Sequence, residues 1–391
     1  MNRKYDFDQI IDRKNTHSVK FDSLQDVFGK ENILPMWVAD MDFLSPPEIT
    51  EALKQRVEHG IFGYVVPDEE YYNSIINWLR KRHNWTIEKQ AISFVPGVVK
   101  GYAFAIDEFT DVNDRIIIQP PVYPPFKSIT KGLDRVVVNN PLILENGQYR
   151  MDFDNLRELA KTGCKMLILC NPHNPAGRVW SKEELHELAE ICFDNDILVI
   201  SDEIHSDLAL PGYKHTPFAT VSDKAAKNNI TLMAPSKTFN IAGIVSSFAV
   251  VENREIRKRY FHYLNARQLG EGTIFGYLAS QYAYSQGEEW LNQAIEYIQK
   301  NIDFVDKYLQ KNIPQIKVVM PEASFLIWLD CRELNLTQKE LENLFIHKAK
   351  LGLNSGKMFG KEGEGFMRLN VGCPRSTIEK ALDNLKKAVT L

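Results

Sequence analysis

The sequence predicts an α/β protein whose larger part is a mostly parallel sheet flanked by helices and whose smaller part is an α+β domain. Seven short apolar runs are continuous rather than alternating, which is typical of strands buried on both faces. Helical patterns lie between several of these runs, as right-handed crossovers of a parallel sheet require. The last hundred residues instead mix short strands with long helices.

The apolar runs are rich in β-branched residues and are bounded by turn residues. Segment 181–195 is an example of the helices between them, because Ser181 is followed three residues later by Glu184, the pattern of a capping box. The seven runs are residues 91–95, 115–119, 135–139, 166–170, 197–201, 230–234 and 247–251.

The C-terminal part has helical patterns at about 287–311 and 337–349, with short strand-like segments, a glycine-rich loop and a final helix after them. We therefore expect three parts of the chain. Residues 1–49 form an arm that packs on the small domain, residues 50–285 form the large domain, and residues 286–391 form the small domain.

Composition excludes several classes of protein. With 47 Lys and Arg against 51 Asp and Glu, the formal charge is −4, which argues against a nucleic-acid or anionic-membrane partner. No apolar run approaches the roughly 18 residues that span a bilayer, and the polar N-terminus has no signal-peptide core. The five cysteines contain no CxxC pair, so neither a disulfide framework nor a zinc site is indicated. We expect a cytoplasmic protein without a metal.

Ligands of open α/β sheets bind beyond the carboxyl ends of the strands, so the residues after each run are candidates. Gly97, Val98 and Val99 follow the first run and open a helical pattern, whose free N–H groups suit a phosphate, although an ordinary turn accounts for them equally. Tyr123 lies in a proline-flanked loop, where its ring can stack on a flat ligand or simply pack. The turn NPHNPAG fixes Asn174 at the same edge.

Charged residues follow the next runs. Asp202 and His205 do not belong to a nucleotide or metal site, because the chain has no GxxxxGK[ST] motif and no HExxH-type spacing. The carboxylate then suits an ion pair with a protonated ring nitrogen of a ligand, or it caps a helix. Lys237 also follows a buried run, and a desolvated lysine can form a Schiff base, whereas most lysines are solvated. Arg368 lies in a strand-like segment and suits either a substrate carboxylate or a surface ion pair.

The motifs NPHNPAG, SDEIHSD and APSKTFN, in that order, resemble those of the fold-type-I pyridoxal-phosphate (PLP) enzymes, the aspartate-aminotransferase superfamily. The narrower resemblance is to cystathionine beta-lyase-like C–S lyases of the MalY/PatB type. It extends over nearly the whole chain and is carried by the segments PMWVADMDF, FGY, PGVV, SDEIH, SKTFNIAG and FMRLNVGCPR.

The resemblance implies pyridoxal 5′-phosphate as cofactor and a fold-type-I PLP transferase fold. Lys237 would hold the cofactor as a Schiff base and act as the proton-transfer base, and Asp202 would pair with the pyridinium nitrogen. Further cofactor contacts are implied for Tyr64, Gly97, Val98, Val99, Tyr123, Asn174, His205 and Ser236. Substrate contacts are implied for Val38, Ala39, Asp40, Tyr123, Asn174 and Arg368.

The resemblance also implies a homodimer, because Tyr64 would reach the phosphate from the partner subunit. One departure from the broader aminotransferase pattern concerns that phosphate. The arginine two residues beyond the glycine of SKxFxxxGxR is replaced here by Val245, so that Ser236 is the nearest hydroxyl group.

The activity implied by the resemblance is that of a C–S β-lyase, which cleaves L-cystathionine or related S-substituted L-cysteines to a thiol, pyruvate and ammonia. An aminotransferase is the alternative, because it shares every step through removal of the Cα proton. A regulatory protein that uses the fold without turnover is a third hypothesis, which the presence of Lys237, Asp202 and Arg368 together disfavours.

Overall fold

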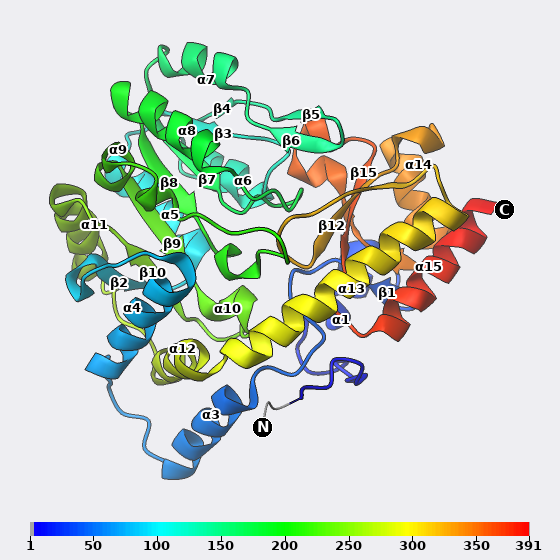
Figure 1. Cartoon of the computed structure of the whole chain (residues 1–391), viewed down its shortest axis with the longest axis horizontal. Coiled ribbons are helices and arrows are strands. Elements are labelled where there is room, and N and C mark those ends of the chain that lie inside the picture. Colours follow the sequence, from blue (N-terminus) through cyan, green and yellow to red (C-terminus); the bar gives the residue numbers. More distant parts are fainter. Residues whose placement is uncertain (1–3, 391) are drawn as a thin grey trace.

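The computed structural model describes residues 4–390 and contains a seven-stranded sheet in the order β2-β10-β9-β8-β7-β3-β4 (Figure 1). Within the described residues, β10 is the one strand of this sheet that runs opposite to the other six. The predicted class, a mostly parallel sheet flanked by helices, is confirmed. The strands are β2 (Ile92–Val95), β3 (Arg115–Ile118), β4 (Val136–Asn139), β7 (Cys164–Cys170), β8 (Leu198–Asp202), β9 (Asn229–Met233) and β10 (Ser247–Val250).

Each of the seven apolar runs forms one of these strands, and β7 shows why the runs are continuous. Successive side chains of a strand point to opposite faces of the sheet. Met166 and Ile168 pack into a core with helices on one face, whereas Leu167 and Leu169 pack into a second core on the other. The covering helices are α5 (Val98–Phe109), α6 (Pro124–Gly132) and α11 (Arg254–Ala266) on the first face, and α7 (Phe153–Ala160), α8 (Lys182–Asp194) and α9 (Asp223–Lys227) on the second.

The C-terminal residues form a second, four-stranded antiparallel sheet in the order β11-β12-β15-β14. The long helix α13 (Glu288–Asn312) leads from the large sheet to this region and packs along α15 (Arg375–Thr390) (Figure 1). The remaining elements here are β11 (Lys317–Val319), β12 (Leu326–Asp330), α14 (Gln338–Asn343), β13 (Leu351–Gly352), β14 (Asn354–Ser355) and β15 (Phe366–Asn370).

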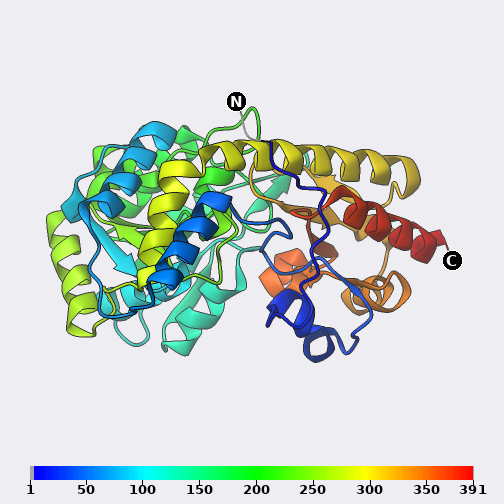
Figure 2. The same cartoon turned by 90° about the horizontal axis from the view of Figure 1, so that it is seen from below.

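The N-terminal segment lies against the C-terminal region, as Figure 2 shows for the dark blue chain beside the orange and red elements. Strand β1 (Leu34–Pro35) pairs with β13, and Phe7 packs on Trp290. The exact domain boundaries at 49/50 and 285/286 stay a prediction. The other elements of the chain are α1 (Val19–Asp22), α2 (Leu24–Phe28), α3 (Pro47–His59), α4 (Glu69–His83), β5 (Ile143–Glu145), β6 (Gln148–Arg150), α10 (Pro235–Thr238) and α12 (Ile274–Gln286).

None of the helices within residues 4–390 is both long enough and apolar enough to span a membrane.

Candidate active site

A cavity of about 240 Å³ lies where the carboxyl ends of the large-sheet strands face the small sheet. Ten residues singled out from the sequence line it, and they come from widely separated parts of the chain: Val38, Ala39, Val98, Val99, Tyr123, Asn174, Asp202, His205, Lys237 and Arg368. Four further lining residues were not predicted: Trp37, Cys170, Ile204 and Asn354.

The strand ends place several of these side chains. Asp202 is the last residue of β8, Asn174 lies in the loop after β7, and Lys237 lies in α10 directly after β9. Gly97 ends the turn after β2 with φ at 119°, a backbone conformation that glycine adopts readily, and α5 begins at the next residue. The first N–H groups of α5, at Val98 and Val99, therefore point toward the cavity end of the helix without intrahelical partners.

The amine of Lys237 donates a hydrogen bond to the carbonyl oxygen of Ala39 at 2.6 Å. Burial lowers the pKa of this amine to about 8. The charge of Arg368 lowers the pKa as well, while those of Asp40 and Asp202 raise it. A lysine with this pKa has a substantial neutral fraction near neutral pH and is therefore able to act as a nucleophile or a base.

The carboxyl group of Asp202 is almost fully buried, with 4% of the residue exposed, and accepts a hydrogen bond from the Ile204 N–H at 3.2 Å. Burial raises the pKa of Asp202 to about 7, and the neighbouring charge of Glu203 acts in the same direction. A buried acid of this kind is stabilised as a carboxylate by a nearby cation. A protonated ring nitrogen in the cavity would supply that cation, so the site fits the pyridine ring of PLP.

The guanidinium of Arg368 also lines the cavity and is buried, with 5% of the residue exposed. Nη1 donates to Asn174 Oδ1 at 3.0 Å, and Nη2 donates to Trp37 O at 3.0 Å and to Asn354 Oδ1 at 2.6 Å. Among the described residues Nε finds no hydrogen-bond acceptor, although it is buried. A buried guanidinium with an unused donor fits the carboxylate of a bound amino acid.

Two ring side chains complete the predicted set. Burial lowers the pKa of His205 to about 3, with the charges of Lys237 and Arg368 adding to the effect, so its imidazole is neutral. Its buried Nδ1 has no partner within residues 4–390 and is free to contact a ligand. Burial also raises the pKa of Tyr123, whose phenol therefore stays protonated.

Four predicted residues are not part of the cavity lining. Gly97 and Ser236 each precede a lining residue in the chain, with Ser236 8% exposed. The side chain of Asp40 forms ion pairs outside the cavity, described below. Tyr64 is fully exposed in the single chain, and Val245, at the place of the usual arginine, is 39% exposed.

The missed residue Asn354 reaches the site through strand pairing. It lies opposite Arg368 in the β14–β15 register and accepts its shortest hydrogen bond. Trp37 contributes a backbone carbonyl, for which a sequence carries no side-chain signal.

Comparison with known proteins gives the family. The family described as aminotransferase class I and II matches residues 31–385. Cystathionine beta-lyase PatB of Bacillus subtilis (strain 168) is 43% identical over 385 residues, which cover 98% of this chain and 100% of that protein. The structure of cystalysin from Treponema denticola, described as containing a pyridoxal 5′-phosphate cofactor, is 38% identical with a TM-score of 0.96 and 99% coverage of each chain.

The structure of a PLP-bound C–S lyase from Staphylococcus hominis is 34% identical, has a TM-score of 0.92, and covers 100% of this chain and 99% of that one. The resemblance stated from the motifs is thereby confirmed at the level of both the fold and the family. The chain belongs to the class I and II aminotransferase family and has its fold-type-I architecture.

Proposed function

We propose that this protein is a PLP-dependent C–S β-lyase that cleaves L-cystathionine or related S-substituted L-cysteines to a thiol, pyruvate and ammonia. The observation that carries the proposal is the convergence of Lys237, Asp202 and Arg368 on one cavity. The names of the relatives support the lyase reaction, since they are a cystathionine beta-lyase and a C–S lyase.

The residues present fit the cofactor. Lys237 would hold it covalently through Nζ, and Asp202 would pair with its ring nitrogen. The N–H groups of Val98 and Val99 would bind its phosphate, and Tyr123 would contact the ring. When bound, PLP supplies an electron sink for the pair of electrons left at the substrate Cα.

The chain's own groups then perform three tasks. Arg368 binds the substrate α-carboxylate and fixes the orientation of the Cα–H bond. Lys237 gives up its bond to the cofactor when the substrate's amino group takes its place, and its freed Nζ, an amine whose pKa burial lowers to about 8, accepts the Cα proton. Loss of the thiolate from Cβ completes the elimination, and water converts the remaining three-carbon fragment to pyruvate and ammonia.

The test supplies purified protein with PLP and L-cystathionine in the absence of any keto acid. Pyruvate and free thiol are followed together, with Lys237→Ala as the control. Equal release of the two products over many turnovers, lost in Lys237→Ala, is the expected result. Turnover that requires an added keto acid and yields no pyruvate would instead identify an aminotransferase.

We also propose a homodimer in which each site uses Tyr64 of the other subunit. In support, Tyr64 lies in a segment of exposed apolar side chains, with Ile61, Phe62 and Val66 exposed by 66%, 57% and 85%. Apolar patches of this kind are typical of contact surfaces.

The dimer is tested by mixing. Tyr64→Ala and Lys237→Ala are expected to be nearly inactive alone, but a hybrid of the two contains one intact site if Tyr64 acts across the interface. Random pairing then restores on the order of a quarter of wild-type activity. If the mixture stays inactive, Tyr64 does not act on the partner's site.

We place the protein in the cytoplasm. In support, the cysteines of the described chain, Cys164, Cys170, Cys192, Cys331 and Cys373, are all free thiols, as a reducing compartment keeps them. Recovery of the native protein in a periplasmic or secreted fraction would contradict this location.

A further inference from the structure

The segment Trp37–Asp42, here called the strap, crosses the substrate end of the cavity. Its backbone carbonyls contact both functional cations of the site. Trp37 O accepts from Arg368 Nη2 at 3.0 Å, and Ala39 O accepts from Lys237 Nζ at 2.6 Å. The position of the strap therefore sets the surroundings of the proposed carboxylate-binding group and of the proposed base at the same time.

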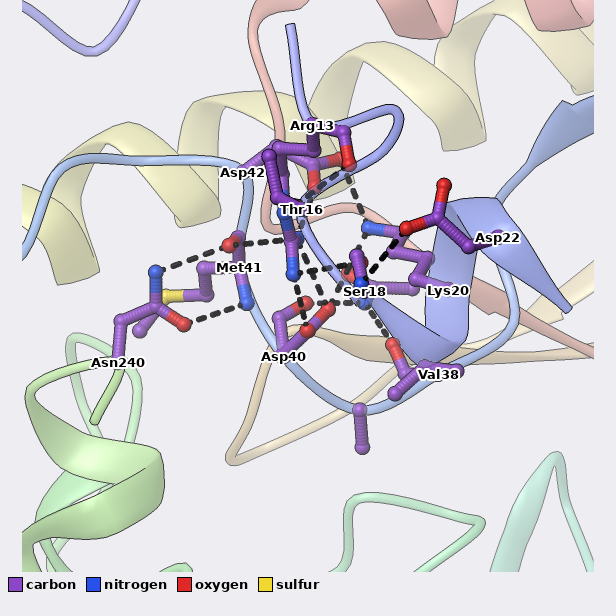
Figure 3. Close-up of polar contacts among 12 residues, drawn as sticks. Arg13, Thr16, Ser18, Lys20, Asp22, Val38, Asp40, Met41, Asp42 and Asn240 are labelled. Carbon is purple, nitrogen blue, oxygen red and sulfur yellow. Dashed lines mark hydrogen bonds and ion pairs between the residues drawn. The ribbon is translucent and has the colours of Figure 1, made fainter. Parts of the chain in front are cut away.

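The strap is tied to strand β15, which carries Arg368, and to the residues just after helix α10, which carries Lys237. Asn370, two residues after Arg368, donates from Nδ2 to Val38 O at 2.6 Å and to Asp40 O at 2.7 Å. The side-chain amide of Asn240, three residues after Lys237, accepts from the Met41 N–H and donates to the Met41 carbonyl oxygen, each at 2.9 Å. These contacts hold the strap to the two elements of the site, and Figure 3 shows the pair of hydrogen bonds between Asn240 and Met41.

On its other side the strap is held by four charged residues that we call the clasp: Arg13, Lys20, Asp40 and Asp42. Arg13 contacts Asp40 and Asp42 at 2.6 Å each, and Lys20 contacts Asp42 at 2.7 Å and Asp40 at 3.8 Å (Figure 3). Both cations come from the first 20 residues of the N-terminal arm, and both acids belong to the strap, which is a later part of the same arm.

The clasp differs from an ordinary surface ion pair in its burial. The side chain of Lys20 is 1% exposed, that of Asp42 11% and that of Arg13 22%. Burial alone lowers the pKa of Arg13, but the carboxylates of Asp40 and Asp42 raise it by more. Since buried charges are weakly screened and costly to leave unpaired, each of the four depends on the others.

The clasp also controls a charge near the base. The carboxylate of Asp40 acts on Lys237 and favours its protonated form. Arg13 and Lys20 offset this negative charge by direct contact. Loss of an arm cation would therefore release the strap and leave Asp40 less compensated beside the amine.

We propose that Arg13 and Lys20 are positioning residues for the substrate end of the site, which hold the strap through Asp40 and Asp42 and keep its carbonyls on Arg368 and Lys237. The side chain of Asp40 is then the strap's anchor to the arm and not a ligand of the substrate. This inference rests on the proposed function only in taking an amino acid as the substrate.

The first experiment compares Arg13→Gln, Asp40→Asn and the double variant, with Arg157→Gln as the matched control. Arg157 forms an ion pair with Glu187 on the surface, and its side chain is 48% exposed. With cofactor-loaded protein and L-cystathionine, we expect each single change to raise KM about tenfold and kcat to change by less than about threefold. The double variant should show an increase well below the hundredfold product, because both changes break the Arg13–Asp40 contact.

If the double variant instead multiplies the two effects to about a hundredfold, Asp40 and Arg13 act independently and the anchor role is wrong. The proposal also fails if Asp40→Asn raises KM while Arg13→Gln leaves it unchanged, since Asp40 would then bind the substrate directly. Arg13→Lys should raise KM less than Arg13→Gln does, because the ammonium charge of lysine replaces only part of the forked contact of arginine.

A second readout does not depend on turnover. Hydrogen exchange of the cofactor-free protein reports the amides of Met41, bound to Asn240, and of Asp42, bound to Gly372 O at 2.7 Å. Arg13→Gln and Asp42→Asn should each speed exchange of these amides without affecting the large-sheet strands. Unchanged exchange in both variants would overturn the proposal even if the wild type proved to catalyse another reaction. Absence of lyase turnover in the wild type would overturn only the proposed function.

Discussion

Arg368 in β15 donates a hydrogen bond to Asn174 in the loop after β7 at 3.0 Å, across 194 residues of chain. This contact joins the two sheets directly at the cavity, since β15 belongs to the four-stranded sheet and β7 to the seven-stranded one. The proposed carboxylate-binding group and the proposed cofactor-binding loop therefore hold each other in place.

Replacement of Arg368 by lysine should weaken substrate binding although the charge is kept. An ammonium group cannot reproduce the forked contacts to Asn174, Asn354 and Trp37. We expect Arg368→Lys to raise KM for L-cystathionine at least about tenfold, with Arg157→Lys unchanged. Steady-state kinetics measure this, and a KM within about twofold of wild type would remove Arg368 from the carboxylate site.

Asp202→Asn should keep or raise the stability of the cofactor-free protein but lower the activity of the loaded enzyme. Burial raises the pKa of Asp202 to about 7, so at pH 8 the free protein carries a buried carboxylate that destabilises it. We expect the cofactor-free variant to melt at or above the temperature of the wild type. In the loaded enzyme the lost ion pair should lower kcat by about 100-fold or more. A cofactor-free variant that melts several degrees lower would contradict the assignment.

Much of this site follows from local sequence. The continuous runs become the sheet strands, the capping box at Ser181 and Glu184 is present, and the residues that follow β7, β8 and β9 line the cavity. Parallel strands place their carboxyl ends at one edge, so a local pattern suffices to bring these residues together.

Other features depend on pairing between distant segments. Asn354 reaches Arg368 only through the β14–β15 register, and β10 runs antiparallel although its apolar run resembles those of the parallel strands. The local sequence does not predict the clasp either, because Arg and Asp are residue types usually found on the surface. Arg13 and Asp42 become a partly buried ion pair only when these two distant segments pack together. Composition and periodicity do not encode such contacts.

Gly177 at the end of the NPHNPAG turn should tolerate no side chain. Its φ is +68°, and an added Cβ would lie 2.5 Å from Pro321 Cβ and 2.9 Å from Ala323 O. Its carbonyl also accepts from the N–H groups of Glu322 and Ala323. We expect Gly177→Ala to cost about 2 kcal/mol or more of unfolding free energy in urea titrations. Gly147→Ala is the control, because it shares a positive φ but meets nothing within 4 Å.

Stability should fall in mild acid through His173. Burial lowers the pKa of His173 to about 3, below the roughly 6.5 of an unfolded histidine. The contribution of neutral His173 to the free energy of unfolding is therefore fully present above pH 6.5. It is lost as the pH falls toward 3, because in this range only the unfolded chain binds the proton. Between pH 6.5 and 4.5 the loss is about 2.3 kcal/mol.

Denaturant titrations of wild type and His173→Gln at several pH values isolate this effect from those of other groups. The difference in unfolding free energy between the two proteins should shrink as the pH falls. A difference that stays constant from pH 7.5 to 4.5 would show that His173 binds its proton as readily in the folded protein as in the unfolded chain.

The contacts of the N-terminal arm determine when, during synthesis of the chain, the arm is able to pack in its final place. Phe7 packs on Trp290, β1 pairs with β13, and the strap is held by Asn370, so the partners of the first residues made are among the last. A chain emerging from the ribosome contains Lys237 and Asp202 well before Trp290, β13 and Asn370, the later partners of the arm, have been made. The substrate end of the site is therefore closed only after synthesis is nearly complete, and a prematurely terminated product holds the reactive lysine without its cover.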